Sequence, residues 1–210
     1  MQWTTRFGFI TAAALILATF PCLTASAQAP VTNERSATYD FPNSHQIRMH
    51  LAAGEYTVQR SPDNQIHVRW SSADSKESAD NLKVSFTNNR GTAQIQTKHA
   101  KKMKVIFQLP SPSDLRIRLA VGELRLEGIE GNKDISMSVG EIHVQVDDPA
   151  LYAHVSSSVR VGDIKATPFR GSKSGFFRHF DFKGQGTYSL HATLGVGDVV
   201  FSQAGPSRTD

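Results

Sequence analysis

Apolar and polar residues alternate in short runs along most of this chain. The early runs space their apolar residues two apart, as in Ile47, Met49 and Leu51, Ile66, Val68 and Trp70, and Leu82, Val84 and Phe86. Turn-forming residues interrupt the pattern at 61–64, 88–91 and 111–114. A period of two is typical of strands that bury one face, so the pattern predicts an all-β chain. Residues 73–82 are the one stretch that could hold a helical turn, and a loop fits them equally well.

A short phrase recurs five times within this alternation: an apolar residue, glycine, an acid and a second apolar residue. Its glycines and acids are Gly54-Glu55, Gly122-Glu123, Gly140-Glu141, Gly162-Asp163 and Gly197-Asp198. Self-similarity of this kind indicates stacked units that cannot bury their apolar faces alone. Gly122, Gly140 and Gly162 are 18 and 22 residues apart, a spacing that suits the rungs of a β-solenoid with parallel strand pairing.

The other spacings are longer. Gly162 and Gly197 are 35 residues apart, and we expect an insertion at 167–186 between them. Gly54 precedes Gly122 by 68 residues, so the N-terminal half should be a less regular, hairpin-based sheet that continues the stack. The predicted fold is therefore all-β: a β-solenoid or β-helix-like stack of short strands with a hairpin sheet at its N-terminal side.

Two segments carry a resemblance to a known family. One is Pro110 with the alternating run 115–124, and the other is the closing run 184–199. Together with the repeated rungs, they resemble the bacterial putative adhesin family, also called toastrack domains, over roughly residues 40–202. The resemblance implies an envelope-exposed, repeat-built β domain without catalytic residues. Ser156-Ser157-Ser158 departs from the apolar alternation of the family pattern, which predicts an imperfect rung around Gly162.

The N-terminus predicts an exported protein. Arg6 is the only charge in residues 1–27, an apolar run spans 7–23, and Ala25-Ser26-Ala27 forms a small-residue cleavage pattern. We expect a signal peptide at 1–27, with an uncleaved anchor as the alternative. Cys22 is the only cysteine, so cleavage leaves a chain without disulfides or zinc thiolates.

The rest of the chain divides into a flexible leader at 28–38, one adhesin-like domain at 39–202 and a polar tail at 203–210. No other apolar stretch is long enough for a spanning helix. The formal charge of +4 falls to +3 when Arg6 is removed, and this mild bias gives no reason to expect a nucleic-acid partner.

Two charged features have both a binding and a structural interpretation. The five acids after the repeat glycines would form a row if the rungs stack in register, and such a row could bind Ca²⁺. The favoured interpretation is structural: each glycine supplies a turn or bulge conformation, and the acid after it accepts backbone N–H hydrogen bonds or points to water. The basic run 98–104 could dock an anionic polymer or lipid headgroup, but a solvated hairpin turn is favoured.

The expected insertion is rich in aromatic and basic residues. Its candidate binding residues are Phe176, Phe177, Arg178, Phe180 and Phe182. Such a concentration of aromatic rings could form a surface for a protein partner, a glycan or a membrane interface. The alternative is that the rings cap the open end of the solenoid core.

The sequence gives no support for an enzyme, a metal site or a cofactor. The histidines lack metal-binding spacings, and His50, His67, His143 and His191 fall at polar positions of alternating strands, so they should face outward. The repeated acids occur once per rung, whereas a glycosidase needs two carboxyl groups across a sugar. Nucleophile and phosphate-loop motifs do not occur.

These features predict a non-catalytic, exported module for interactions at the cell envelope or surface, in the periplasm, at the cell surface or secreted. Its role would be adhesion or protein contact in envelope-stress signalling, with an envelope protein or a glycan as partner. One alternative is a β-helix protein that binds or degrades polysaccharide. Another is a structural protein that self-assembles through its sheet edges.

Overall fold

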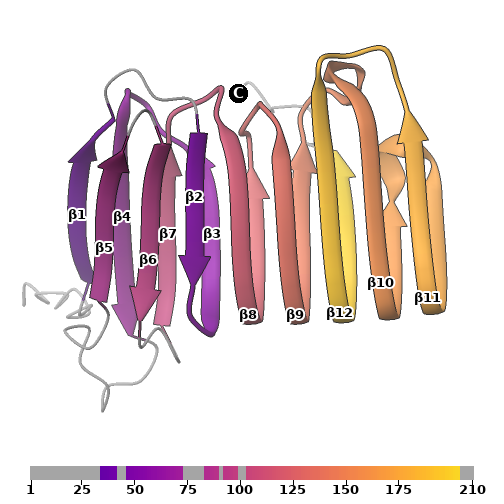
Figure 1. Ribbon diagram of the computed structural model, residues 1–210, viewed down its shortest axis with the longest axis horizontal. Coiled ribbons are helices and arrows are strands. Elements are labelled where there is room, and N and C mark those ends of the chain that lie inside the picture. The colour runs from indigo at the N-terminus through magenta and orange to yellow at the C-terminus, as the bar shows by residue number, and fades with distance from the viewer. Residues whose placement is uncertain (1–33, 42–45, 73–82, 90–91, 99–102, 204–210) are drawn as a thin grey trace, which may run out of the picture. The chain divides into compact units, whose positions relative to one another are not determined.

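The computed structural model describes residues 34–41, 46–72, 83–89, 92–98 and 103–203 (Figure 1). The chain divides into two compact units, Met1–Val31 and Thr32–Asp210, and all described residues belong to the second. The predicted signal peptide, the tail after Gln203 and the possible helical turn at 73–82 lie outside the described residues.

The described part of the second unit is almost entirely β-strand, which confirms the all-β prediction. The strands are β1 (Glu34–Asp40), β2 (Gln46–Leu51), β3 (Gly54–Arg60), β4 (Gln65–Ser72), β5 (Lys83–Asn89), β6 (Thr92–Lys98), β7 (Met103–Leu109), β8 (Asp114–Glu127), β9 (Lys133–Val146), β10 (Tyr152–Ala166), β11 (Gly171–Lys183) and β12 (Tyr188–Gln203). Two single-turn 3-10 helices, η2 (Pro149–Leu151) and η3 (Thr167–Phe169), flank β10. Because β1 begins at Glu34, ordered strand starts inside the stretch predicted to be a flexible leader.

Each long strand bends in its middle, at the repeated Val-Gly-acid phrase. In β8 the inward residues are Leu115, Ile117 and Leu119 before the bend and Leu124 and Leu126 after it. Leu119 and Leu124 are five positions apart, an odd number, so the inward face switches parity across the bend. The two legs of the strand can therefore face each other, and both contribute side chains to one core.

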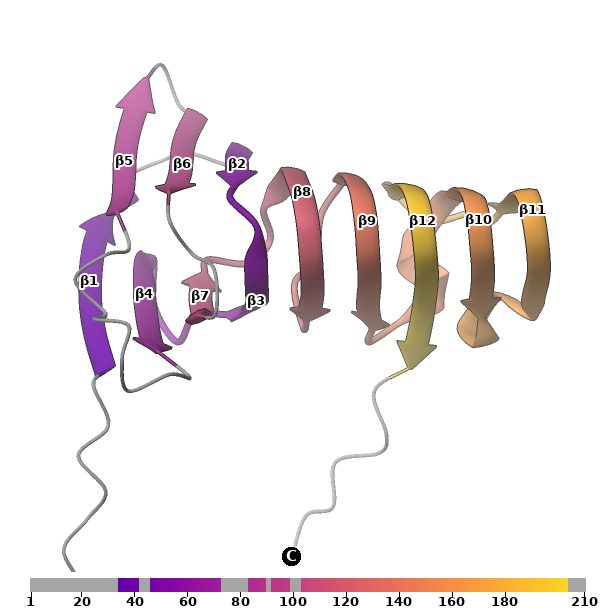
Figure 2. The same cartoon turned by 90° about the horizontal axis from the view of Figure 1, so that it is seen from below.

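The long strands pair in parallel, as the solenoid prediction requires. Their spatial order is β8-β9-β12-β10, and β11 pairs antiparallel with β10 at the end (Figures 1 and 2). The rungs therefore do not follow the chain, because β12 lies between β9 and β10. The segment expected as an insertion at 167–186 forms η3 and β11, and β11 is the terminal strand of the stack.

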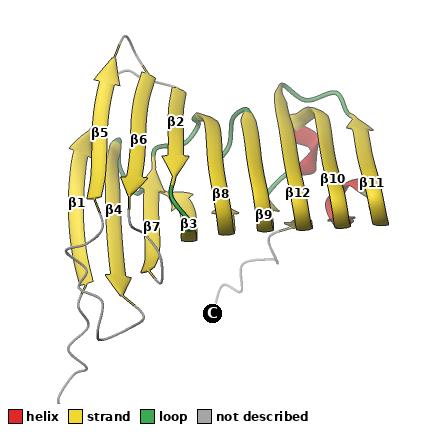
Figure 3. Ribbon diagram, turned by 60° about the horizontal axis from the view of Figure 1, so that its bottom comes forward, coloured by secondary structure: helices red, strands yellow, loops and turns green. Residues whose placement is uncertain are grey.

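The N-terminal strands continue the stack through a split rung. β2 pairs with β6 and with the first leg of β8, whereas β3 pairs with β7 and with the second leg of β8. β5 extends the first layer and β4 and β1 extend the second by antiparallel pairing (Figure 3). β6 and β7 thus lie in different layers, so the predicted hairpin across the basic run is wrong; residues 99–102 of that run lie outside the described residues.

Aromatic side chains pack at both ends of the core. Tyr39 on β1 stacks on Phe86 of β5 with ring centroids 4.7 Å apart. At the other end Phe169 packs against Phe182 at 4.9 Å and edge-on against Phe201. These rings cover the terminal rungs, which would otherwise expose apolar core to water. No helix among the described residues is long and apolar enough to cross a membrane.

Candidate functional site

The repeat glycines form one column at the bends of the stacked strands. Gly122 pairs with Gly54 and with Gly140, and Gly140 pairs with Gly197. Gly122, Gly140, Gly162 and Gly197 have φ between +128° and +143°. A Cβ on Gly140 would lie 1.8 Å from the carbonyl oxygen of Gly122. Glycine is required here both for the backbone conformation and for the close approach of neighbouring rungs.

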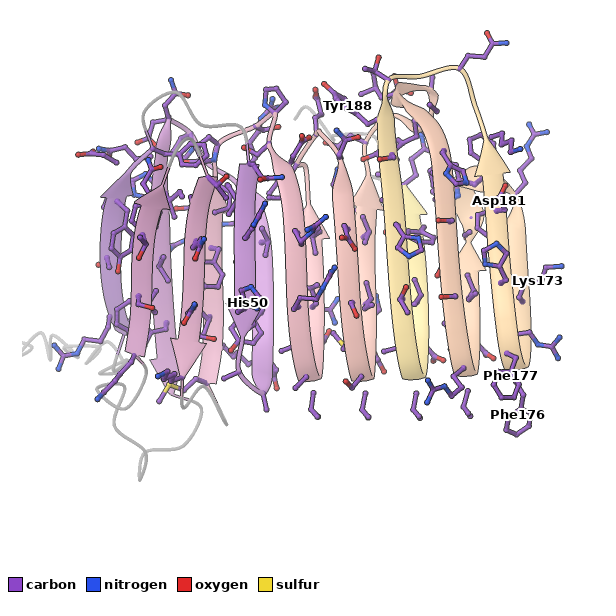
Figure 4. All side chains as sticks on the ribbon, in the orientation of Figure 1. His50, Lys173, Phe176, Phe177, Asp181 and Tyr188 are labelled. Atoms are coloured by element: carbon purple, nitrogen blue, oxygen red, sulfur yellow. The ribbon has the colours of Figure 1, made fainter. Side chains whose placement is uncertain are left out.

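The residue before each glycine projects outward, so the bends carry an apolar ridge. Val121, Val139 and Val196 are 47%, 43% and 46% exposed. Val161 of β10 pairs with Phe176 of β11, which places Phe176 at the end of this row. Figure 4 shows Phe176 and Phe177 projecting outward from the bend of β11.

The acids after the glycines are also in register, as the stacking prediction implied. Glu123 pairs with Glu55 and Glu141, and Glu141 pairs with Asp198. The carboxylate of Asp198 accepts a hydrogen bond from the Asp163 backbone N–H at 3.0 Å, which is the structural role expected for these acids.

Basic side chains accompany the same row. Arg125 forms an ion pair with Glu123, and Lys104 lies 4.0 Å from Glu55. The His143 Nε2 lies 3.0 Å from the Glu141 carboxylate, and donor atoms of Glu123, Glu141 and His143 fall within 4.8 Å of one another. A cation there would compete with the guanidinium of Arg125 for Glu123.

The structure divides the predicted aromatic binding residues into two groups. Phe176 and Phe177 are 68% and 80% exposed, and Arg178 is exposed as well. Phe180 is only 7% exposed and belongs to the core. Phe182 is half-buried against Phe169. The capping interpretation therefore describes Phe180 and Phe182, and we correct the candidate surface to the first three residues.

The backbone of β11 is irregular where these side chains emerge. Phe177 has φ +51° and Arg170 has φ +55°, a left-handed conformation that bulky residues rarely adopt. Gly175 has φ +110°, and its missing side chain leaves room for the Arg178 guanidinium, whose Nη2 lies 2.8 Å from the Cβ position. Irregularity and charge on a free edge oppose pairing with another strand, which disfavours self-assembly through β11.

A groove of about 680 Å³ opens beside Phe177 on the outer face of the first layer. Its lining comes from β9, β10, β11 and β12 and includes Phe177, Arg160, Arg178, His179, Ser158 and Thr193. Among the described residues, none of those that line this groove carries a carboxylate. Strand pairing brings these lining residues together. Ser158 pairs with His179 and with Thr193, and Arg160 and Phe177 are the next outward-facing positions toward the bend.

A second hollow of about 460 Å³ adjoins the first. Ser136 and Ser138 of β9 line both. The second is also lined by His50, Arg118 and Gln96, and its described lining residues include no carboxylate. Together the two hollows form a track across seven strands, from β11 to β6, which we call the outer groove.

The acids nearest the outer groove are already paired. Asp181 binds His154 Nε2 at 2.7 Å, and this hydrogen bond lowers the pKa of the Asp181 carboxyl. Asp134 accepts two hydrogen bonds from Arg118, at 3.1 and 2.9 Å, which lower its pKa. In contrast, Arg160 and Arg178 form no ion pair within the described part of the chain.

Ser156 and His191 form a pair that superficially resembles part of a hydrolase site. Ser156 Oγ lies 2.7 Å from His191 Nδ1, and the other ring nitrogen lies 3.1 Å from Thr193 Oγ1. A catalytic triad requires a carboxylate to orient the imidazole, but here both ring nitrogens face hydroxyl groups. The pair is therefore a polar contact between β10 and β12.

Two features of the structure could not be identified from the sequence. Arg160 has no distinguishing neighbours in the chain, and the antiparallel pairing of β10 with β11 brings it beside Phe177. Lys133 at the start of β9 is 2% exposed, and its Nζ donates hydrogen bonds to Gly131 O and Tyr152 Oη at 3.0 and 2.8 Å. Burial lowers the pKa of Lys133 to about 8. In the sequence Lys133 follows a turn at the start of a polar and apolar alternation, and nothing there predicts its burial.

No protein-family model and no curated protein matches this chain. Among solved structures, a putative cell adhesion protein from Clostridium sporogenes aligns with a TM-score of 0.56 and 12% identity over 82% of this chain and all of the other. A putative adhesin from Bacteroides fragilis aligns at 0.26 and 13% over 80% and 96%, and one from Parabacteroides merdae at 0.35 and 11% over 81% and 92%. The first shows a shared fold, so the resemblance to the adhesin family is confirmed at the level of the fold.

Proposed function

We propose that this protein is an exported, non-catalytic, adhesin-like module that makes its contacts at the cell envelope or surface. The shared fold with a protein described as a putative cell adhesion protein supports this role, as does the signal-like segment at 1–27. N-terminal sequencing of the exported protein tests the second point, and we expect the mature chain to begin at Gln28.

The observation that carries the proposal is the exposure of Phe176 and Phe177 at one end of the stack. Two neighbouring phenylalanines with exposures of 68% and 80% are unusual on a soluble surface, and apolar side chains at such positions mark interaction sites. Burying each ring against a partner would contribute roughly 1.5–3 kcal/mol. The strained backbone of Phe177 holds its ring away from the core.

A binding assay on intact cells and isolated envelopes tests this surface. The labelled protein is compared with a Phe176→Ser, Phe177→Ser variant and with a Val121→Ser control, which removes an exposed apolar group from the same ridge on β8, outside the groove. We expect at least about tenfold weaker binding for the first variant and little change for the control. Equal binding by both variants and the wild type would refute the assignment.

A further inference from the structure

We propose that the outer groove binds an acidic polysaccharide, with uronic-acid carboxylates on Arg160 and Arg178 and a sugar ring against Phe177. This inference rests on the proposed function, because it names the ligand of the same surface.

The charge of the groove selects an anion. Arg160 and Arg178 line the groove together with Phe177, the described residues that line the two hollows include no carboxylate, and Asp181 is hydrogen-bonded to His154. A guanidinium presents paired donors that match the two oxygens of a carboxylate. Neither arginine is ion-paired with another described residue, so both are available to a carboxylate of a ligand.

The aromatic side chain supplies the second element of recognition. Phe177 is 80% exposed and forms a wall of the groove next to its arginine neighbours. One face of a pyranose ring carries mostly C–H groups, and packing that face on the phenyl ring removes apolar surface from water.

The floor of the groove suits the hydroxyl groups of a sugar. Ser158 and Thr193 lie on adjacent strands with hydroxyl oxygens 3.5 Å apart, and Ser136 and Ser138 continue the floor onto β9. Hydroxyl side chains both donate and accept hydrogen bonds, as sugar hydroxyls do.

The length of the groove indicates a chain instead of a single sugar. The outer groove crosses seven strands, so six strand spacings of about 4.8 Å give a track of roughly 29 Å. Ser136 and Ser138 join its two halves, and Gln96 and His50 offer polar groups at the far end. Figure 4 labels His50 on β2. A linear polymer can contact the arginine end and the hydroxyl floor together.

The ligand pair that tests this inference is polygalacturonate and its fully methyl-esterified form, which has the same sugar chain without the charge. Affinity electrophoresis and calorimetry would compare the wild type with Arg160→Gln, Arg178→Gln, with Phe177→Ser, and with Lys173→Gln. Lys173 is an exposed cation on β11 outside the groove, so its variant is a matched control. All substitutions are at exposed positions, and circular dichroism checks the fold.

We expect polygalacturonate to bind the wild type at least about tenfold more tightly than the methyl ester does. The double arginine variant and Phe177→Ser should each lose at least about tenfold in affinity for polygalacturonate, whereas Lys173→Gln should stay within about twofold. Equal binding of the two polymers, or no effect of the arginine substitutions, would overturn the inference. So would equally tight, arginine-dependent binding of a thymidine oligonucleotide, which would make the groove a nucleic-acid site.

This experiment separates the two proposals. If the protein still binds cells through Phe176 and Phe177 but ignores polygalacturonate, the ligand class is wrong and the adhesin-like role stands. If the cell-binding assay also shows no dependence on these phenylalanines, the proposed function fails with it.

Discussion

Replacing Gly140 by alanine should be among the most destabilising single changes in this fold. The new Cβ would lie 1.8 Å from the Gly122 carbonyl oxygen, and contacts under 3.0 Å essentially never occur, so the two rungs would have to part by at least 1.2 Å. Backbone hydrogen bonds near 2.9 Å break at that separation.

The cost has two parts. Loss of two interstrand hydrogen bonds destabilises by about 1 kcal/mol each, and an alanine at φ +133° adds about 1–3 kcal/mol of backbone strain. The total of about 3–5 kcal/mol is a large share of the 5–15 kcal/mol that stabilises an ordinary domain. In urea this should lower the unfolding midpoint by roughly 1–2 M.

Gly128→Ala is the matched control. Gly128 also has positive φ, at +63°, but the nearest atom to its Cβ position is 3.6 Å away. We expect a loss of only about 1 kcal/mol. Urea unfolding followed by far-UV circular dichroism compares both variants. Equal destabilisation would show that the stacked glycines are needed for their backbone conformation alone, and that close approach between rungs contributes nothing.

Three further predictions concern polar groups in and near the core. The pKa of Lys133 is about 8 in the folded chain, against 10.5 for an ordinary lysine. Between these pH values the unfolded chain binds one more proton than the folded chain, so the free energy of unfolding should rise with pH by about 3 kcal/mol in total. Lys133→Met should flatten this pH dependence, as measured by urea unfolding at a series of pH values. Ser157 is fully buried, and its hydroxyl has no hydrogen-bond partner among the described residues. Ser157→Ala should therefore stabilise the fold by about 1 kcal/mol, and a lower melting temperature would contradict this. Asp134→Asn should lower the free energy of unfolding by about 0.5–1 kcal/mol, because solvent partly screens the ion pair with Arg118. The folded chain lowers the pKa of Asp134, so this difference between variant and wild type should shrink as the pH falls below about 4 and the carboxylate becomes protonated.

Local features of the sequence predicted the rungs well. The period of two identified the strands, and the Val-Gly-acid phrase identified the bends, with Gly122 against Gly140 and Glu123 against Glu141 as expected. These predictions succeeded because one leg and one bend are determined by residues close together in the chain.

The order of the rungs could not be predicted in the same way. Every rung offers the same glycine column and a similar apolar face, so β9 can accept β10 or β12 on local grounds. The outer groove depends on that spatial order, since Thr193 and Gly195 line it only because β12 lies between β9 and β10. Phe180 was misassigned for a related reason: a cluster of phenylalanines suggests exposure until β11 is known to be the end of the core.

The position of β12 between β9 and β10 has a consequence for how the chain acquires its structure. A solenoid built in chain order can grow rung by rung as each repeat emerges. Here β10 and β11 cannot join the stack until residues 188–203 arrive and fill the gap beside β9. The last strand therefore completes the middle of the stack, and this long-range dependence favours slow, all-or-none folding. A chain truncated before Tyr188 would leave β9 with an open edge and the groove without its floor.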